Sequence, residues 1–483
     1  MFKNFSAREW LIAAACGFGM AGLLVVWFMS GHTPEVALTM TLSAIIAYAA
    51  VGALMWAFLH RKNFEMSVWR GVAAGLGVSV LALPVFWLVL VVINFILRAP
   101  MPIFEYIVGP IEGILLLPSF ALLAWTTIGW ASGALCALTG GILAYSQVRS
   151  LREPAAKSRA AQILNGVGIV LLIGAILLGV TGCFPVSLNG LGSQPHPVAT
   201  YADAMTALEK IRAREETLSL VPVCKTQWMT HNQKTDKVIV FFHGLSNCPE
   251  QFNPLGQQFF ERGYNVLIAR FPEHVDISRD PAHMRPTAEQ FRAMTDEAID
   301  IAQGLGEHVY VMGLSGGAGV ASWVAQERSD VARVVSIAPF YGLGLLPSWL
   351  NPWAMNVLTR LPNIPARSSA SPVPYQYLGM SSMGVGETMR FAAMASQDAA
   401  RQPIKAGSFL LILNDNDVVV SNSMALRIFE QRRALGGNVE LFTLGKEYGL
   451  PHDIIDPHQR AGNVDFVYPL LIDLTEGRIP TLR

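Results

Sequence analysis

The chain has 483 residues, a formal net charge of +0 and 52% hydrophobic residues, but only 14% charged residues. Soluble proteins usually carry about 25% charged residues, so this balance indicates a membrane protein rather than a large soluble enzyme. The neutral charge, with no basic patch, argues against a nucleic-acid partner. Almost all long apolar runs precede Cys183, and the rest of the chain has the composition of a globular domain with a full core.

Five apolar runs in the first part of the chain approach or exceed the roughly 20 residues that cross a bilayer as a helix. They are Leu11–Met29, Val36–Leu59, Gly71–Leu97, Ser119–Tyr145 and Ile163–Gly182. We therefore predict a transmembrane domain of about five helices over residues 1–183. Pro84 lies inside the third run and predicts a kink there.

Lys and Arg residues set the predicted orientation, because cytoplasmic loops of membrane proteins carry an excess of both. They gather in the amino-terminal tail and in the second and fourth loops, at Lys3, Arg8, Arg61, Lys62, Arg70, Arg149, Arg152, Lys157 and Arg159. We expect the amino terminus in the cytoplasm and the large carboxy-terminal domain outside it, at a bacterial inner membrane. The apolar stretch Pro102–Leu117 is an alternative extra span, which the basic fourth loop disfavours.

Residues 184–200 are rich in Gly, Pro and Ser, which predicts a linker to a domain over residues 201–483. Cys224 and Cys248 are the two cysteines of that domain, and they flank a predicted strand. In the oxidising space outside the cytoplasm these residues are expected to form a disulfide. Two free buried thiols are the alternative.

Strands alternate with helices through the second domain, which predicts a mostly parallel sheet covered by helices on both faces. The expected strands are Val238–Phe242, Asn265–Ala269, His308–Met312, Ala332–Ile337, Ser408–Leu413 and Asn438–Leu444. The expected helices are Tyr201–Glu216, Pro249–Arg262, Thr287–Leu305, Gly316–Glu327 and Asn422–Leu435. The alternation breaks over residues 340–405, which contain Trp349, Trp353 and a Met-rich stretch. This segment is too long for a bare loop and is interpreted as a cap.

Ser315 lies in the pattern Gly-x-Ser-x-Gly, directly after a predicted strand and before a predicted helix. This context is typical of a nucleophile elbow, a strained turn that exposes the serine hydroxyl at the edge of a sheet. Gly313 and Gly317 allow the strand and the helix to approach closely. The pattern therefore predicts that Ser315 is a catalytic nucleophile.

The same region also satisfies Gly-x-x-x-Gly-x-Gly, through Gly313, Gly317 and Gly319, as in the nucleotide loop of short-chain dehydrogenases. Such enzymes use a downstream Tyr-x-x-x-Lys pair. Neither of the later lysines, Lys405 and Lys446, has a tyrosine four positions before it. The dehydrogenase hypothesis is therefore rejected.

A serine hydroxyl needs a base to take its proton and a carboxylate to orient that base. In hydrolases with this elbow, the acid and then the histidine follow the serine on loops after later strands. The stretch Asn414–Val420 follows one predicted strand, and Gly449–Asp453 follows the next. The order and spacing of the chain thus favour a Ser-Asp-His triad.

From about Tyr201 to Ile479 the chain resembles an α/β-hydrolase of the bacterial carboxylesterase and monoacylglycerol-lipase-like kind. The resemblance rests on the Ser315 elbow and on His243-Gly244, Asn247-Cys248-Pro249, Gly263-Tyr264-Asn265-Val266 and Leu450-Pro451-His452-Asp453. It implies the α/β-hydrolase fold and a serine hydrolase activity. The motifs are specific for the superfamily and say little about the substrate.

The resemblance assigns the acid to Asp417, because the family pattern Gly-x-x-Asp-x-x-Val maps onto residues 414–420. Asp415 is the alternative acid. Asn414 replaces the usual glycine of this pattern, which we interpret as mild because Asn tolerates left-handed backbone angles. The base is assigned to His452, ahead of His458.

The oxyanion-hole role falls to the backbone N–H groups of Leu245 and Gly316, by the same resemblance. His243 is interpreted as a structural hydrogen-bonding group. Where relatives usually carry Pro-Gly-His-Gly, this chain has Pro272-Glu273-His274-Val275, so the loop that faces the cap is expected to differ.

These observations predict a membrane-anchored serine hydrolase that cleaves carboxylic esters, lipid or acyl esters among them, through an acyl-enzyme. No motif for a cofactor or a metal ion is visible in the sequence. The alternative is a catalytically silent binding or sensor domain coupled to a membrane transport domain. The apolar runs contain almost no ionisable residues of the kind that mark a transport path, which disfavours this alternative.

Overall fold

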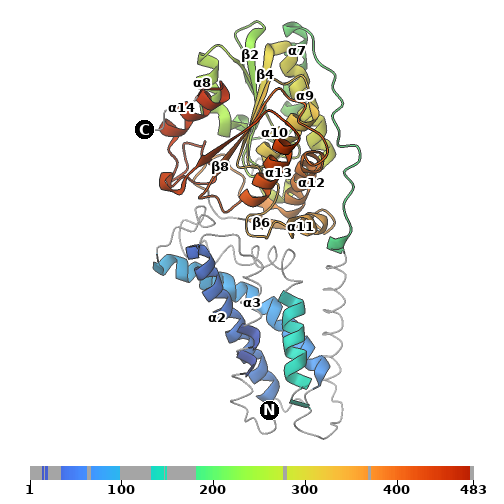
Figure 1. Ribbon diagram of the computed structural model, residues 1–483, viewed down its shortest axis with the longest axis vertical. Helices are drawn as coiled ribbons and strands as arrows, with labels where there is room; N and C mark the ends of the chain where they lie inside the picture. Colours follow the sequence, from blue (N-terminus) through green and yellow to red (C-terminus); the bar gives the residue numbers. More distant parts are fainter. Residues whose placement is uncertain are drawn as a thin grey trace. The chain divides into compact units, whose positions relative to one another are not determined.

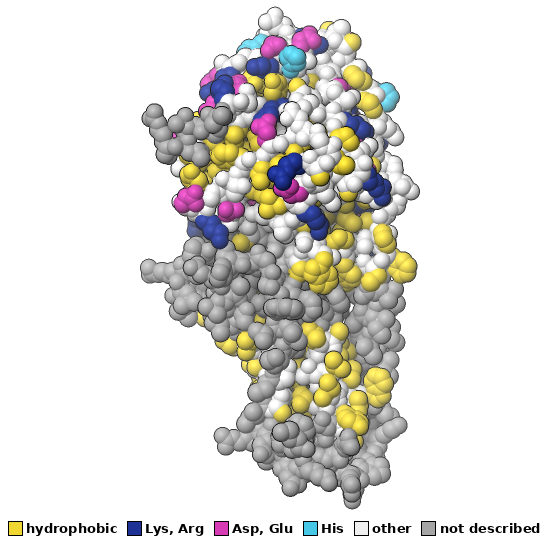
Figure 2. Space-filling model, viewed as in Figure 1, with side chains coloured by type: hydrophobic (Ala, Val, Ile, Leu, Met, Phe, Trp, Pro, Cys, Tyr) yellow, Lys and Arg dark blue, Asp and Glu magenta, His cyan; other side chains and the backbone are white. Residues whose placement is uncertain are grey.

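The computed structural model describes residues 13–15, 17–19, 34–61, 67–97, 132–145, 147–148, 181–275, 280–367 and 371–478 (Figure 1). The chain divides into two compact units, and the second begins at Val186 apart from a short earlier stretch. On the face shown in Figure 2, the charged side chains gather on the second unit.

Two long helices, α2 (Pro34–Arg61) and α3 (Val68–Leu97), pack against each other in the first unit. A further helical stretch covers residues 132–145. A Cβ atom on Gly71 would lie 2.1 Å from the carbonyl oxygen of Gly140, and one on Gly75 would lie 1.9 Å from that of Cys136. The glycines therefore let two helix backbones touch, as small residues do between membrane helices.

The segment Val68–Val89 of α3 is, among the described helices, the one long and apolar enough to cross a membrane. Shorter apolar helices cover Ser43–Leu59 and Ser132–Tyr145. Several side chains on these helices are large, apolar and exposed, among them Leu54, Leu81, Leu138 and Ile142. Most of the first and fifth predicted spans, part of the fourth, and the Pro102–Leu117 stretch lie outside the described residues, so the five-helix domain stays a prediction.

A seven-stranded sheet forms the centre of the second unit, in the order β1-β3-β2-β4-β5-β8-β9. The strands are β1 (Gln227–Met229), β2 (Thr235–Phe242), β3 (Asn265–Ala269), β4 (Gly306–Leu314), β5 (Arg333–Ile337), β8 (Phe409–Asn414) and β9 (Val439–Leu444). Only β1 runs antiparallel to its neighbour. The predicted parallel sheet is confirmed, and the central strands are apolar because helices cover both faces.

Helices α8 (Asn253–Glu261) and α14 (Val464–Thr475) lie on one side of the sheet, and α9 (Ala288–Leu305) and α10 (Gly316–Glu327) lie on the other (Figure 1). Helix α7 (Tyr201–Glu216) packs against α9, and α13 (Asn422–Ala434) contacts β8 and β9. Helix α9 begins with a capping box, in which Thr287 and Gln290 exchange hydrogen bonds between side chain and backbone.

The predicted cap segment contains two helices, α11 (Asn351–Leu358) and α12 (Ser382–Asp398), and a small antiparallel pair, β6 (Pro365–Arg367) and β7 (Gly379–Ser381). Helix α12 packs against both α10 and α11. The segment also reaches the turn after β2, because Tyr377 N–H donates a hydrogen bond of 2.9 Å to the carbonyl oxygen of Ser246.

The predicted linker lies against the second unit and is held there by hydrogen bonds. Trp323 Nε1–H donates to the Leu191 carbonyl oxygen at 2.8 Å, and Ser193 Oγ–H donates to Asp296 at 2.6 Å. Arg390 of α12 donates to the Ser187 carbonyl oxygen at 2.8 Å. A segment that is rich in Gly, Pro and Ser thus forms an extended strap, because its backbone groups find partners on the folded domain.

Candidate active site

Ser315 stands between β4 and α10 with backbone angles of φ 57° and ψ −116°. A non-glycine residue with positive φ is strained, and such strain is typical of a nucleophile elbow. The elbow requires its glycines, since a Cβ atom on Gly313 would lie 2.1 Å from the Gly317 carbonyl oxygen. One on Gly317 would lie 1.9 Å from the carbonyl oxygen of Phe242. The local sequence therefore holds the serine at the carboxyl edge of the sheet.

His452 and Asp417 form a close pair, in which His452 Nδ1–H donates to Asp417 Oδ2 at 2.6 Å. The histidine side chain is 7% exposed and the aspartate side chain 0% exposed. The second carboxylate oxygen accepts the N–H groups of Val419 at 2.8 Å and Val420 at 3.3 Å. The structure therefore brings His452 to Asp417 rather than to Asp415, whose side chain is exposed.

Ser315 and His452 line the same cavity, which has a volume of about 180 Å³. Typical ligand pockets measure about 300–1,000 Å³, so this cavity is small. Gln376 and Tyr377, from the predicted cap segment, also line it. A hydrogen bond connects the cap segment to the turn after β2, since Gln376 Nε2–H donates to Ser246 Oγ at 3.1 Å.

The backbone N–H groups of Leu245 and Gly316 lie next to each other beside the serine. A Cβ atom on Gly316 would lie 3.2 Å from Leu245 N, and one on Gly244 would lie 3.9 Å from Ser315 Cβ. Neither N–H group donates a hydrogen bond to another residue in the part of the chain that the structure describes. Gly316 also opens α10, where the helix dipole favours negative charge.

Two buried histidines, His243 and His274, contact the turn after β2 that carries Gly244 and Leu245. His243 Nε2 accepts the Phe271 N–H at 3.1 Å, so its Nδ1–H is free to donate to the Gly244 carbonyl oxygen at 2.8 Å. Burial, followed by the charge of nearby His274, holds the pKa of His243 well below its usual value. His243 therefore stays neutral and has the geometry of a hydrogen-bonding support.

His274 was noticed in the sequence only as part of an unusual loop. Its Nε2 lies 2.6 Å from the Leu245 carbonyl oxygen, and burial lowers the pKa of its imidazole to about 4. The preceding Glu273 has a φ of 59°, and its side chain accepts a hydrogen bond from Gln290 at 3.0 Å. The loop thus keeps a left-handed turn without glycine and contacts Leu245, which lies beside Gly316 at the serine turn.

Asn414 links β8, the acid strand that precedes Asp417, to the base loop Gly449–Asp453, which carries His452. The sequence did not reveal this role. Its side-chain amide donates to the carbonyl oxygens of Leu450 at 3.0 Å and Pro451 at 2.8 Å, directly before His452. Asn414 ends β8 as an ordinary strand residue. The departure from the family glycine is therefore explained by these hydrogen bonds, because the backbone is not left-handed there.

Cys224 and Cys248 are joined by a disulfide. Cys248 follows the turn that carries Leu245, and Cys224 lies in a short helix over Pro222–Cys224. The bond therefore fastens the first part of the second unit to the turn beside the serine. No group of three or more His, Cys, Asp or Glu side chains that could hold a metal ion occurs among the described residues.

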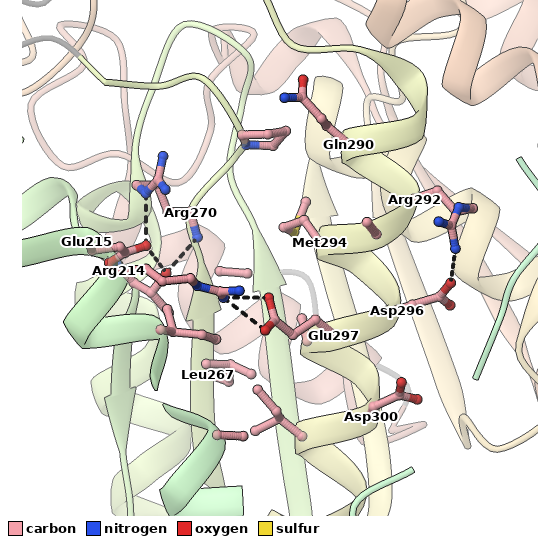
Figure 3. Close-up of a pocket in the computed structure, with 18 of the residues that line it drawn as sticks. Arg214, Glu215, Leu267, Arg270, Gln290, Arg292, Met294, Asp296, Glu297 and Asp300 are labelled. Atoms are coloured by element: carbon pink, nitrogen blue, oxygen red, sulfur yellow. Dashed lines mark hydrogen bonds and ion pairs between the residues drawn. The ribbon is translucent and has the colours of Figure 1, made fainter. Parts of the chain in front are cut away.

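A larger groove of about 1110 Å³ lies between α7, β3 and α9, away from Ser315 and His452 (Figure 3). Each of its three guanidinium groups is paired with a carboxylate that also lines the groove. Arg214 reaches across the groove to Glu297 at 2.8 Å, Arg270 pairs with Glu215 at 2.8 Å, and Arg292 pairs with Asp296 at 3.2 Å. This α7–α9 groove contains none of the predicted site residues.

Residues 239–433 match the model of the alpha/beta hydrolase family. A monoacylglycerol lipase from Paleococcus ferrophilus is 18% identical, with 52% of this chain and 98% of that chain covered and a TM-score of 0.41. A soluble variant of monoglyceride lipase from Saccharomyces cerevisiae is 11% identical, with 53% and 92% covered and a TM-score of 0.40. One of the metagenome-derived lipolytic enzymes LipS and LipT is 16% identical, with 54% and 100% covered and a TM-score of 0.40. No curated protein matches the chain.

Proposed function

We propose that this alpha/beta hydrolase domain cleaves carboxylic esters through an acyl-enzyme on Ser315. The observation that carries the proposal is that His452, paired with the buried Asp417, lines one small cavity together with a strained serine. The family match supports a hydrolase, and the roles of the three residues are our assignment.

In the proposed reaction, His452 Nε2 takes the proton of Ser315 Oγ while this oxygen attacks the ester carbonyl carbon. Asp417 holds the imidazole in the tautomer that leaves Nε2 as the acceptor, and it stabilises the imidazolium that forms. The carbonyl oxygen becomes an oxyanion and accepts the N–H groups of Leu245 and Gly316. The tetrahedral intermediate then collapses, and the leaving alcohol takes the proton from His452.

Water completes the cycle by the same route. His452 takes one proton from a water molecule, whose oxygen attacks the acyl carbon on Ser315. Collapse of the second tetrahedral intermediate releases a carboxylic acid and returns the proton to Ser315 Oγ. The atoms balance as one ester and one water yielding one acid and one alcohol.

The size of the cavity indicates how long an acyl group it can hold. A volume of about 180 Å³ holds few heavy atoms beyond the ester itself, so short acyl groups fit it as it stands. Long acyl chains would have to extend beyond this cavity. We therefore propose a carboxylic ester with a short acyl group, and lipid esters as the competing class.

We further propose that the first unit anchors the enzyme in the bacterial inner membrane, with the hydrolase domain on the outer side. The apolar helix Val68–Val89, the glycine contacts of α3 and the exposed leucines support the anchor. The distribution of Lys and Arg and the disulfide of Cys224 with Cys248 favour the outer side. A reporter fused after Arg483 that functions only in the cytoplasm should stay silent, and activity of this reporter would contradict the orientation.

The hydrolase proposal is tested on the full chain in detergent with a fluorophosphonate probe and a series of p-nitrophenyl esters of rising acyl length. We expect labelling and turnover that Ser315→Ala abolishes. Ser423→Ala removes an exposed serine of α13 and serves as the matched control, with both signals unchanged. A folded wild-type protein that is neither labelled nor active would favour the silent binding domain instead.

A further inference from the structure

The side chain of Gln251 connects two loops of the site that are far apart in the sequence. Its carbonyl oxygen Oε1 accepts the N–H of Gly244 at 2.8 Å, and its Nε2–H donates to Asp453 Oδ2 at 2.7 Å. Gln251 is 2% exposed and Asp453 is 3% exposed. Both hydrogen bonds are therefore shielded from water, where such bonds hold geometry most firmly.

Each end of this bridge is one residue away from a group that the reaction uses. Gly244 precedes Leu245, whose N–H we assign to the oxyanion hole, and Asp453 follows His452. Gln251 and Asp453 also line the cavity together with Ser315. A shift of the Gln251 amide would thus move the oxyanion donor and the base loop at the same time.

Asp453 is held from several sides. Asn247 Nδ2–H and Gln459 Nε2–H lie 3.4 and 3.3 Å from Oδ2, and the backbone N–H of Asp456 donates to Oδ1 at 3.2 Å. The Gln251 contact is the shortest of these, and Gln251 also accepts the Gly244 N–H of the turn that carries Leu245. The Gln251–Asp453 contact is therefore the shorter of two side-chain connections between the loops, and the longer one comes from Asn247.

We propose, on the basis of the proposed function, that Gln251 and Asp453 are positioning residues that align the Leu245 N–H and the His452 imidazole with each other. The Gln251 amide fixes the Gly244 peptide, and the Asp453 carboxylate fixes the base loop. Because a misplacement of about 1 Å at a reacting group costs on the order of a hundredfold in rate, loss of the bridge should lower turnover strongly.

The charge of Asp453 has a second effect. Burial, and then repulsion from Asp456, raise the pKa of Asp453 to about 6, so the carboxylate is ionised at neutral pH. The ionisable groups around it are His452 and Asp456 of its own loop, Tyr375 of the cap segment and Tyr468 of α14. An ionised Asp453 favours the imidazolium form of His452, which is the form that develops during the reaction.

The first test replaces Gln251 in the full chain in detergent. Gln251→Met keeps the length of the side chain and removes both hydrogen bonds. We expect kcat for a short-chain p-nitrophenyl ester to fall about ten- to a hundredfold, with KM changed less than about threefold. Gln326→Met is the matched control. Gln326 is a fully buried glutamine at the carboxyl end of α10, the end far from Ser315, and its side-chain amide donates to the carbonyl oxygens of Gln402 and Pro403. The kcat of this variant should stay within about twofold of wild type.

A second variant separates positioning from a general loss of structure. Gln251→Glu keeps the acceptor for Gly244, but its ionised carboxylate repels Asp453. When the new carboxyl is protonated it again donates to Asp453, so the ratio of its kcat to that of wild type should rise as the pH falls from 8 to 5.5. A ratio that is independent of pH would contradict the bridge, as would a Gln251→Met enzyme with wild-type kcat.

Asp453 is tested by two replacements that differ in one property. Asp453→Asn keeps an acceptor for Gln251 and removes the charge, so the acid limb of the kcat/KM profile should move to lower pH while kcat falls only severalfold. Asp453→Leu removes the acceptor as well, so kcat should fall as far as in Gln251→Met. Equal kcat values and equal pH profiles for the two variants would contradict the proposal.

The outcome is distinct from failure of the hydrolase assignment. If wild type is neither labelled by fluorophosphonate nor active, the proposed function fails and the bridge has no catalytic role. If wild type is labelled at Ser315 and turns over ester while Gln251→Met does so equally well, the hydrolase assignment stands and the bridge alone is rejected.

Discussion

The α7–α9 groove is much larger than the cavity beside Ser315, but the small cavity is the one that the candidate catalytic groups Ser315 and His452 line. The groove measures about 1110 Å³ and the cavity about 180 Å³. The guanidinium groups along the groove are paired with carboxylates (Figure 3). The cavity is instead lined by a strained serine and by Leu245, whose backbone N–H has no partner among the described residues. A backbone N–H group without a partner in the described part of the chain and a strained backbone at Ser315 are therefore better indicators of the candidate active site than the volume of a cavity.

The largest loss of activity is expected when Asp417, the partner of His452, is replaced. In Asp417→Asn the side chain offers His452 a carbonyl oxygen or an amide N–H instead of a carboxylate, so the tautomer and the imidazolium lose their support. We expect kcat to fall roughly 10³- to 10⁴-fold in ester hydrolysis. The matched control is Asp415→Asn, which changes an exposed carboxylate two residues away and should stay within about twofold. The reverse order would assign the acid to Asp415.

A smaller loss is expected when the acid strand is released from the base loop. Asn414→Ala removes the two hydrogen bonds to the carbonyl oxygens of Leu450 and Pro451. The base loop should then sample positions in which His452 is misaligned, and kcat should fall about tenfold. Asn414→Gly restores the family residue and should not rescue activity, because the side-chain amide is what holds the loop. Recovery in the glycine variant would show that the backbone angle matters instead.

The sheet was predictable because each central parallel strand is a continuous apolar run, as in Val238–Phe242. The short edge strand β1 was missed, since its three residues are a strand only through pairing with β3. The elbow and the cysteine pair could be proposed from local patterns, and Asp417 and His452 from the order of the chain together with the resemblance to α/β-hydrolases.

The supporting contacts could not be predicted from the sequence. The hydrogen bond from Gln251 to Asp453 joins residues that are 202 positions apart, and no local pattern encodes it. The sequence pattern suggests a left-handed backbone angle for Asn414, whereas in the structure its side chain provides the contact. Polar side chains that act across loops become visible only when the fold brings the loops together.

A change in stability, in addition to the change in activity, is expected from the charge of Asp453. Its pKa is raised in the folded state to about 6, above its ordinary value of 3.8. The folded protein therefore holds this proton more tightly than the unfolded chain does, and the stability so gained is present at acid pH and lost as the pH rises through about 6. Asp453→Asn should thus gain in melting temperature relative to wild type between pH 5 and pH 7.5. A difference that is constant over this range would contradict the raised pKa.

The smallest effect is expected in the α7–α9 groove. The side chain of Arg214 is 61% exposed and that of its partner Glu297 is 39% exposed, so the pair should contribute at most about 1 kcal/mol to the free energy of unfolding. Arg214→Ala should therefore leave ester hydrolysis within about twofold of wild type and shift urea unfolding only slightly. The groove ends at Arg270 and Pro272, and Pro272 precedes the loop that places His274 against Leu245. A severalfold change in kcat would consequently mean that the groove communicates with the oxyanion turn through this loop, and the two regions would no longer be independent.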